Sequence, residues 1–170
     1  MRLGLPLALT FAALSISCGA AFDGHTYHGD GFTFRVPPAP NEWRPIDVSH
    51  ASVAYRDPGS DGIVMVNGRC DRDGEDVPLS ALTAHLFMRF SDRETQKEEV
   101  IPFDGREAMR TEAFAKLDGV PRRFLVWVMK KDRCVYDLIY FAAPEHFDQG
   151  SERFDTWARG FDALPRDVSP

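Results

Sequence analysis

Hydrophobic residues recur along this chain with two periods, one typical of strands and one typical of helices. Four runs in the second half combine β-prone residues with an alternating pattern, and they cover residues 96–101, 106–116, 121–130 and 134–142. Short polar or glycine-bearing turns separate them. Because consecutive strands joined so tightly pair with their neighbours, the pattern predicts an antiparallel meander.

The last two runs are apolar on both faces. In the third run the two alternating sets are Phe124, Val126 and Val128 on one side and Leu125, Trp127 and Met129 on the other. A sheet that contains such strands has to be covered on both sides.

Two segments with helical periodicity supply this cover. The first apolar stripe follows Pro78 and consists of Leu79, Leu82, Leu86 and Phe90. The second follows Ser151 as the expected N-cap and consists of Phe154, Trp157, Ala158 and Phe161. The sequence therefore predicts an α+β fold, in which an antiparallel sheet is covered by helices on both faces as an α-β-α sandwich.

Two shorter hairpins are predicted ahead of the first helix. Runs at residues 26–28 and 32–36 flank a glycine-bearing turn, and runs at 52–56 and 63–67 flank a turn-rich segment. The length of the chain leaves room for one such core. We therefore expect a single domain over residues 26–164 and a tail over 165–170.

The first 17 residues resemble a bacterial lipoprotein signal peptide. Arg2 precedes an apolar run at residues 3–16, which is shorter than the roughly 20 residues that span a bilayer, and Cys18 follows among small residues. Cys18 is therefore predicted to begin the mature chain and to carry lipid, with residues 18–25 as a tether. The alternative is an ordinary secretory signal cleaved near residues 19–21. By resemblance to enterobacterial sorting, Gly19 implies the outer membrane, with the domain facing the periplasm.

The remaining cysteines, Cys70 and Cys134, form an even pair in an oxidising compartment. They predict a disulfide, with Cα atoms about 4.4 to 6.8 Å apart. Two separate buried thiols are the alternative. Neither cysteine has a second ligand at metal-binding spacing, so no metal site and no cofactor are predicted. A site made by His25, His28 and Asp30 is the less favoured option.

The net charge of the chain is −6. The adjacent basic pairs are Lys130-Lys131 and Arg122-Arg123, and the sequence shows no larger basic cluster. Nucleic acid and anionic lipid headgroups both require a concentrated positive face, so we expect neither as a partner.

Several motifs resemble the PsbP-like domains. They are Asp30-Gly31-Phe32-Thr33-Phe34-Arg35-Val36-Pro37, Trp43, Val53-Ala54-Tyr55-Arg56-Asp57, Ile63-Val64-Met65-Val66, Asp118-Gly119, Val135-Tyr136-Asp137-Leu138-Ile139-Tyr140 and Gly160-Phe161. The resemblance implies an α-β-α sandwich that acts as a non-enzymatic assembly or binding factor. The lipoprotein-like start and the cysteine pair depart from the plant members, so a photosynthetic role is not implied.

The sequence contains no recognisable catalytic set, which favours a lipid-anchored periplasmic binding or assembly module with an envelope protein as partner. Trp43, Tyr55 and Tyr27 are the candidate binding surface. One alternative is an envelope hydrolase that uses Asp137, the charged residue of the most apolar strand. The other alternative is a purely structural envelope lipoprotein, which would lack a cleft.

Overall fold

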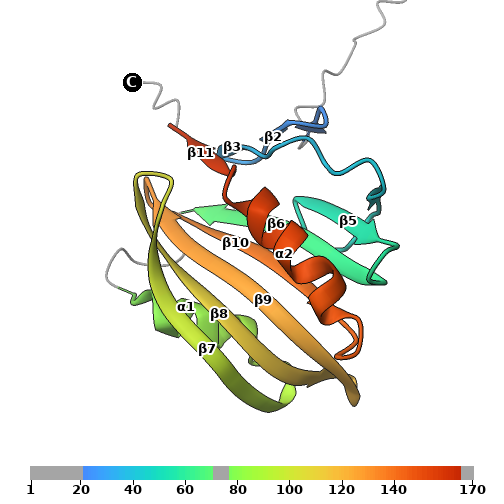
Figure 1. Ribbon diagram of the computed structural model, residues 1–170. Coiled ribbons are helices and arrows are strands. Elements are labelled where there is room, and N and C mark those ends of the chain that lie inside the picture. Colours follow the sequence, from blue (N-terminus) through green and yellow to red (C-terminus); the bar gives the residue numbers. More distant parts are fainter. Residues whose placement is uncertain (1–20, 71–76, 166–170) are drawn as a thin grey trace, which may run out of the picture.

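The computed structural model describes residues 21–70 and 77–165, which form an α+β domain with two antiparallel sheets and two helices (Figure 1). The larger sheet has seven strands in the order β4-β5-β6-β10-β9-β8-β7. Its strands are β4 (Arg44–Pro45), β5 (Val53–Asp57), β6 (Gly62–Cys70), β7 (Ser91–Phe103), β8 (Arg106–Leu117), β9 (Val120–Lys131) and β10 (Cys134–Ala142).

The predicted meander is present as β7, β8, β9 and β10, each paired with the next. The start of β7 differs, because the strand begins at Ser91 and not at Gln96. Its first eight residues are exposed, and its register shifts twice, between Ser91 and Glu94 and between Thr95 and Lys97. A charged, irregular edge strand carries no apolar alternation, which is why the pattern did not reveal its first half.

Strand β10, the most apolar strand, lies between two long neighbours. On one side β10 pairs with β9, and on the other it pairs with β6, from Cys134 opposite Cys70 to Phe141 opposite Ile63. Strands in the middle of a sheet bury both faces. Their position accounts for the double apolar pattern of β9 and β10.

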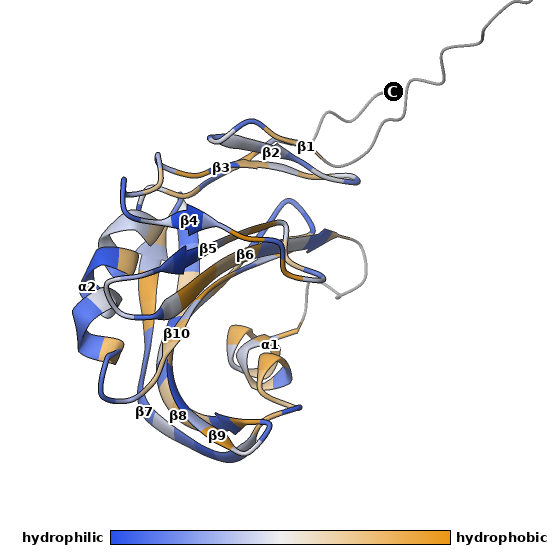
Figure 2. Cartoon of the chain, turned by 90° about the vertical axis from the view of Figure 1, so that its right-hand side faces the viewer, coloured by the Kyte–Doolittle hydropathy of each residue, from blue (hydrophilic) through white to orange (hydrophobic). Residues whose placement is uncertain are grey.

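Each helix lies on its own side of this sheet, which curves around α1 (Figure 2). Helix α1 (Leu79–Leu86) belongs to the core that contains Phe124, Val126 and Val128. Helix α2 (Phe147–Ala158) belongs to the core that contains Leu125, Trp127 and Met129. The alternation read from β9 therefore corresponds to two separate hydrophobic cores.

A second sheet shares the covering of the α2 side, and the sequence predicted its central hairpin but not its two outer strands. This sheet has the order β1-β2-β3-β11, and its strands are β1 (Ala21–Phe22), β2 (Thr26–His28), β3 (Thr33–Arg35) and β11 (Asp162–Leu164). Phe34 and Ala163 from this sheet are buried in the same core as α2. The prediction that helices cover both faces of the sheet is therefore not confirmed, because the smaller sheet covers part of one face.

The domain borders also differ from those expected. Residues 18–25 were assigned to a tether, yet Ala21 and Phe22 form β1 and pair with β2. The last predicted element is the helix whose apolar stripe ends at Phe161, yet β11 follows it and pairs with β3. Strands of two or three residues are too short to show a period, and their pairing is with distant parts of the chain.

Helix α2 begins five residues earlier than predicted. His146 is its N-cap, and the expected cap Ser151 lies inside the helix, one residue after Gly150. Gly150 is required there, since a Cβ atom would collide with the Tyr140 hydroxyl, Ser60 Oγ and Asp57 Oδ2. Neither described helix has the length and apolar character needed to cross a bilayer.

Candidate functional site

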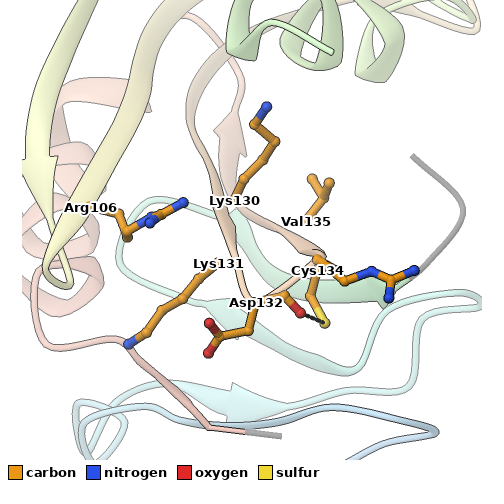
Figure 3. Close-up of a pocket in the computed structure, with 7 residues that line it drawn as sticks. Arg106, Lys130, Lys131, Asp132, Cys134 and Val135 are labelled. Atoms are coloured by element: carbon orange, nitrogen blue, oxygen red, sulfur yellow. Dashed lines mark hydrogen bonds between the residues drawn. The ribbon is translucent and has the colours of Figure 1, made fainter. Parts of the chain in front are cut away.

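A pocket lined mainly by basic side chains, called the basic pocket below, lies at one end of the larger sheet, where the β7–β8 and β9–β10 turns meet (Figure 3). Its volume is about 330 Å³, and its lining residues are Arg106, Lys130, Lys131, Asp132, Arg133, Cys134 and Val135. A second hollow of about 430 Å³ shares Arg106 and Lys130 with it and is also lined by Leu79 and Glu107. The sequence showed Lys130 and Lys131 side by side, but the fold adds Arg106 from another hairpin.

The two lysines of the pocket point away from each other, as neighbouring residues on a strand do (Figure 3). Lys130 Nζ donates a hydrogen bond of 2.7 Å to the carbonyl of Val77, ahead of α1. Lys131 Nζ donates one of 2.9 Å to Asp104 Oδ2, which also accepts the backbone N–H of Ala163 in β11 at 2.9 Å. These contacts fix the pocket walls to α1 on one side and to the smaller sheet on the other.

Arg106 occupies the space between these walls. It is the first residue of β8, it is exposed, and its side chain extends toward the strand that carries the lysines (Figure 3). Within residues 21–70 and 77–165, Arg106 makes no hydrogen bond or ion pair through its side chain. Its guanidinium therefore retains its full set of donors for a ligand.

Arg133 stands in an unusual backbone conformation. Three tight turns of the meander place both central residues at positive φ, as type I′ turns require. Two of them are Asp-Gly, with φ values of 46° and 69° at Asp104-Gly105 and of 50° and 80° at Asp118-Gly119. The third is Asp132-Arg133, at 51° and 63°. An arginine thus takes the place of glycine in the turn that lines the pocket.

The predicted disulfide between Cys70 and Cys134 is present, and its Cys134 lines the pocket. The two cysteines face each other directly in the β6–β10 register. Their Cα atoms are 4.1 Å apart, slightly less than the expected range, because directly opposed residues are the closest pairs in an antiparallel ladder.

Asp137 is buried, as its apolar strand suggested, with 1% of its surface exposed. Arg69 Nη1 donates a hydrogen bond to Asp137 Oδ2 from the neighbouring strand. Asp137 faces Asn67 across the β6–β10 ladder, so Arg69 is its diagonal neighbour on the same face. A guanidinium is thus a partner of this buried carboxylate, and such a charge-assisted hydrogen bond stabilises it inside the fold.

A second buried carboxylate, Asp57, escaped the sequence analysis. Its side chain is fully buried and accepts hydrogen bonds from Ser60 Oγ at 2.8 Å, the Gly59 N–H at 3.0 Å and Arg153 Nη1 at 3.2 Å. The nearby Tyr140 hydroxyl donates to the Phe147 carbonyl at 3.1 Å, and burial raises the pKa of Tyr140 above 10.0. The sequence signal that could have revealed Asp57 was the Asp-Pro-Gly-Ser turn that it begins, because an aspartate in such a turn commonly binds nearby backbone N–H groups.

Trp43 and Tyr55 are not a binding surface, and that prediction is wrong for both. They are 4% and 5% exposed, and they pack against Trp157 of α2 with ring centroids 5.4 and 6.2 Å away. Tyr27 is partly buried and stacks on Phe34 at 5.1 Å. In the fold, Trp157 of α2 packs over Trp43 and Tyr55, while Tyr27 packs within the smaller sheet.

The histidines contribute no metal cluster within the described part of the chain, where no group of three metal-ligating side chains comes together. His25 and His28 are exposed, and the backbone N–H groups of Thr26 and His25 lower the pKa of Asp23. Cys18, the predicted lipidation site, lies outside the described residues.

No protein-family model and no curated protein matches this chain, whereas solved structures do. The cyanobacterial PsbP protein of Synechocystis sp. PCC 6803 is 21% identical, has a TM-score of 0.57 and aligns over 87% of this chain and 98% of its own. LpqN of Mycobacterium tuberculosis, a protein involved in cell envelope biogenesis, is 14% identical, with a TM-score of 0.55 over 81% and 88%. A Pseudomonas aeruginosa protein of unknown function is 11% identical, with a TM-score of 0.50 over 88% and 99%.

The chain therefore has a PsbP-like fold, which confirms the resemblance seen in its motifs. At such low identities the similarity concerns the fold.

Proposed function

We propose that this protein is a non-catalytic binding or assembly module of the cell envelope, anchored by lipid on Cys18 to the outer membrane and facing the periplasm. The lipoprotein-like first 17 residues support the anchor. The fold shared with LpqN, which is involved in cell envelope biogenesis, supports the envelope location. An envelope component is the partner, and nucleic acid is not.

The basic pocket is the observation that carries the binding function. A purely structural lipoprotein has no need of a solvent-open hollow lined by charged side chains, whereas a binding module does. The four basic residues of the pocket come from two hairpins, so the fold itself concentrates them.

The surroundings of Asp137 support the non-catalytic part of the proposal. A hydrolase would place this carboxylate in a pocket beside a histidine or a second acid. Asp137 is instead paired with Arg69 between two strands. A carboxylate held as an ion by a guanidinium is a poor general acid.

Anchoring is tested by labelling cells with palmitate and fractionating them. We expect the wild type to incorporate label and to sediment with outer membranes, and Cys18→Ala to lose both properties. A double variant, Cys70→Ser with Cys134→Ser, is the matched control and keeps the label on a denaturing gel. Equal, soluble pools of wild type and Cys18→Ala would remove the anchor from the proposal.

The absence of turnover is tested with the purified mature domain and a panel of esters, peptides and glycans. We expect no hydrolysis by the wild type and the same result for Asp137→Asn. Hydrolysis that Asp137→Asn abolishes, with the circular dichroism spectrum unchanged, would replace the binding module by the hydrolase.

A further inference from the structure

We propose that the basic pocket binds a phosphate group and that Arg106 and Arg133 are the residues that contact it. The inference deepens the binding function proposed above and rests on it. Three observations lead to it, namely the charge of the pocket, the different roles of its basic residues and the backbone of Arg133.

The charge of the pocket is opposite to that of the chain. Four basic side chains and one acidic side chain line it, whereas the whole chain carries a net charge of −6. A hollow lined mostly by charges of one sign focuses the electrostatic field and raises the local concentration of ions of the other sign. An acidic protein that gathers four cations in one hollow is thus equipped to bind an anion there.

The basic residues have separate tasks. Lys130 and Lys131 are held to Val77 and Asp104 and so form the walls of the pocket. Arg106 lies between them without an ion pair to any described residue. Its planar guanidinium presents five N–H donors, an arrangement that matches two phosphate oxygens at once.

Arg133 is placed where glycine would fit the backbone better. The equivalent positions in the two other turns are Gly105 and Gly119, while Arg133 adopts a φ of 63°. A side chain at positive φ is strained, so a residue other than glycine needs a compensating role. The Asp132-Arg133 turn lines the pocket with its second residue, whereas Gly105 and Gly119 do not line it, so the arginine stands where it can contact a ligand.

A phosphate group fits these features better than a single carboxylate. It carries more charge and more acceptor oxygens, so it engages guanidinium groups from two different turns. A volume of about 330 Å³ holds the group and part of what it is attached to. The same chemistry occurs in soluble phosphate esters and in phospholipid headgroups, and the experiment separates these sources.

The first arm titrates glycerol phosphate into the purified, disulfide-intact mature domain and follows binding by calorimetry. We expect Arg106→Gln and Arg133→Gly to weaken binding by about tenfold or more each, the loss typical of a charge-assisted hydrogen bond. Arg89→Gln is the matched control, since Arg89 is exposed and lies outside the pocket, and it leaves affinity unchanged. Absent binding, or an equal loss in Arg89→Gln, would overturn the phosphate site.

The second arm measures sedimentation of the Cys18→Ser mature chain with phosphatidylglycerol and with phosphatidylcholine vesicles. Binding to phosphatidylglycerol that Arg106→Gln abolishes and Arg89→Gln preserves identifies a lipid headgroup as the source. Binding of glycerol phosphate without vesicle binding identifies a soluble ester. Release of inorganic phosphate from glycerol phosphate would overturn the non-catalytic function while leaving the site in place, so the two proposals fail separately.

Discussion

Arg133 links the backbone of one turn to the chemistry of the pocket, and the strain that it carries is measurable. We predict that Arg133→Gly raises the free energy of unfolding by about 1 kcal/mol, because glycine adopts a positive φ without a steric penalty. The reverse change at the equivalent position, Gly119→Arg, lowers it by a similar amount. Urea denaturation of the three proteins measures both effects.

The same pair of variants separates strain from packing. If Arg133→Gly destabilised the domain, the arginine would be a structural residue of its turn, and its position would no longer point to a ligand. The Gly119→Arg variant provides the scale, since its turn has the same backbone and lies outside the basic pocket.

At the residue scale, the sequence located groups but not their surroundings. Asp137 was recognisable as a charged residue in an apolar strand, yet its partner Arg69 lies 68 positions away and becomes its neighbour through the β6–β10 register. The prediction that Trp43 lies on a binding surface was wrong for the same reason, because Trp157, which packs against it, belongs to α2. Distant pairing is decided by tertiary structure, and a local pattern does not contain it.

At the scale of elements, α2 is tied to the larger sheet by a polar contact as well as by its apolar stripe. Arg153 of α2 reaches Asp57 at the end of β5 and Glu42 ahead of β4. Asp57 is fully buried, so removing the Arg153 guanidinium leaves its carboxylate inside the fold without this ion-pair partner. The carboxylate then keeps only its hydrogen bonds with Ser60 and Gly59 among the described residues.

We therefore predict that Arg153→Met lowers the free energy of unfolding by about 1–3 kcal/mol. Arg159→Met, on the same helix, lowers it by less than about 1 kcal/mol, because Arg159 is 59% exposed and pairs with Asp155 at the surface. Chemical denaturation of the two variants compares them directly. Equal losses would mean that the buried carboxylate does not depend on Arg153.

The elements that the sequence predicted best are those with long, regular patterns. β8, β9 and β10 begin and end within about one residue of the predicted runs, since each alternates over nine or more residues between clear turns. The elements that it missed are β1, β4 and β11, which have two or three residues each and depend on strands elsewhere. Local patterns therefore predicted only the β2–β3 hairpin of the smaller sheet and not the strands on either side of it.

At the scale of the whole molecule, the smaller sheet, the basic pocket and the start of the described chain lie at the same end. Lys131 in the pocket approaches Asp162 of β11 at 4.0 Å. Cys70 is the last residue of β6, and Gly68 of the same strand packs against Phe32 in the turn of the β2–β3 hairpin. Ala21 in β1 is three residues from Cys18, and three residues span at most about 11 Å. A lipid on Cys18 would thus hold the smaller sheet close to the bilayer surface.

The opposite end of the sheet has to lie far from that surface. Strand β9 runs from Val120 to Lys131, and an extended strand of this length measures about 35 Å. Val120 is 46% exposed and follows the β8–β9 turn, at the end of the molecule remote from the smaller sheet (Figure 1). His28, exposed in β2, marks the near end.

We predict that spin labels on His28→Cys and Val120→Cys report different distances from the membrane in the acylated protein. The native Cys70 and Cys134 are bonded to each other, so each variant has one reactive thiol. In vesicles with nickel-chelating lipids, the label at position 28 relaxes faster than the label at position 120, because paramagnetic relaxation falls steeply with distance. In the Cys18→Ser background both labels lose the effect. Equal relaxation at the two positions in the acylated protein would mean that the domain does not stand with its smaller sheet toward the bilayer, and the basic pocket would then lose its place near the headgroups.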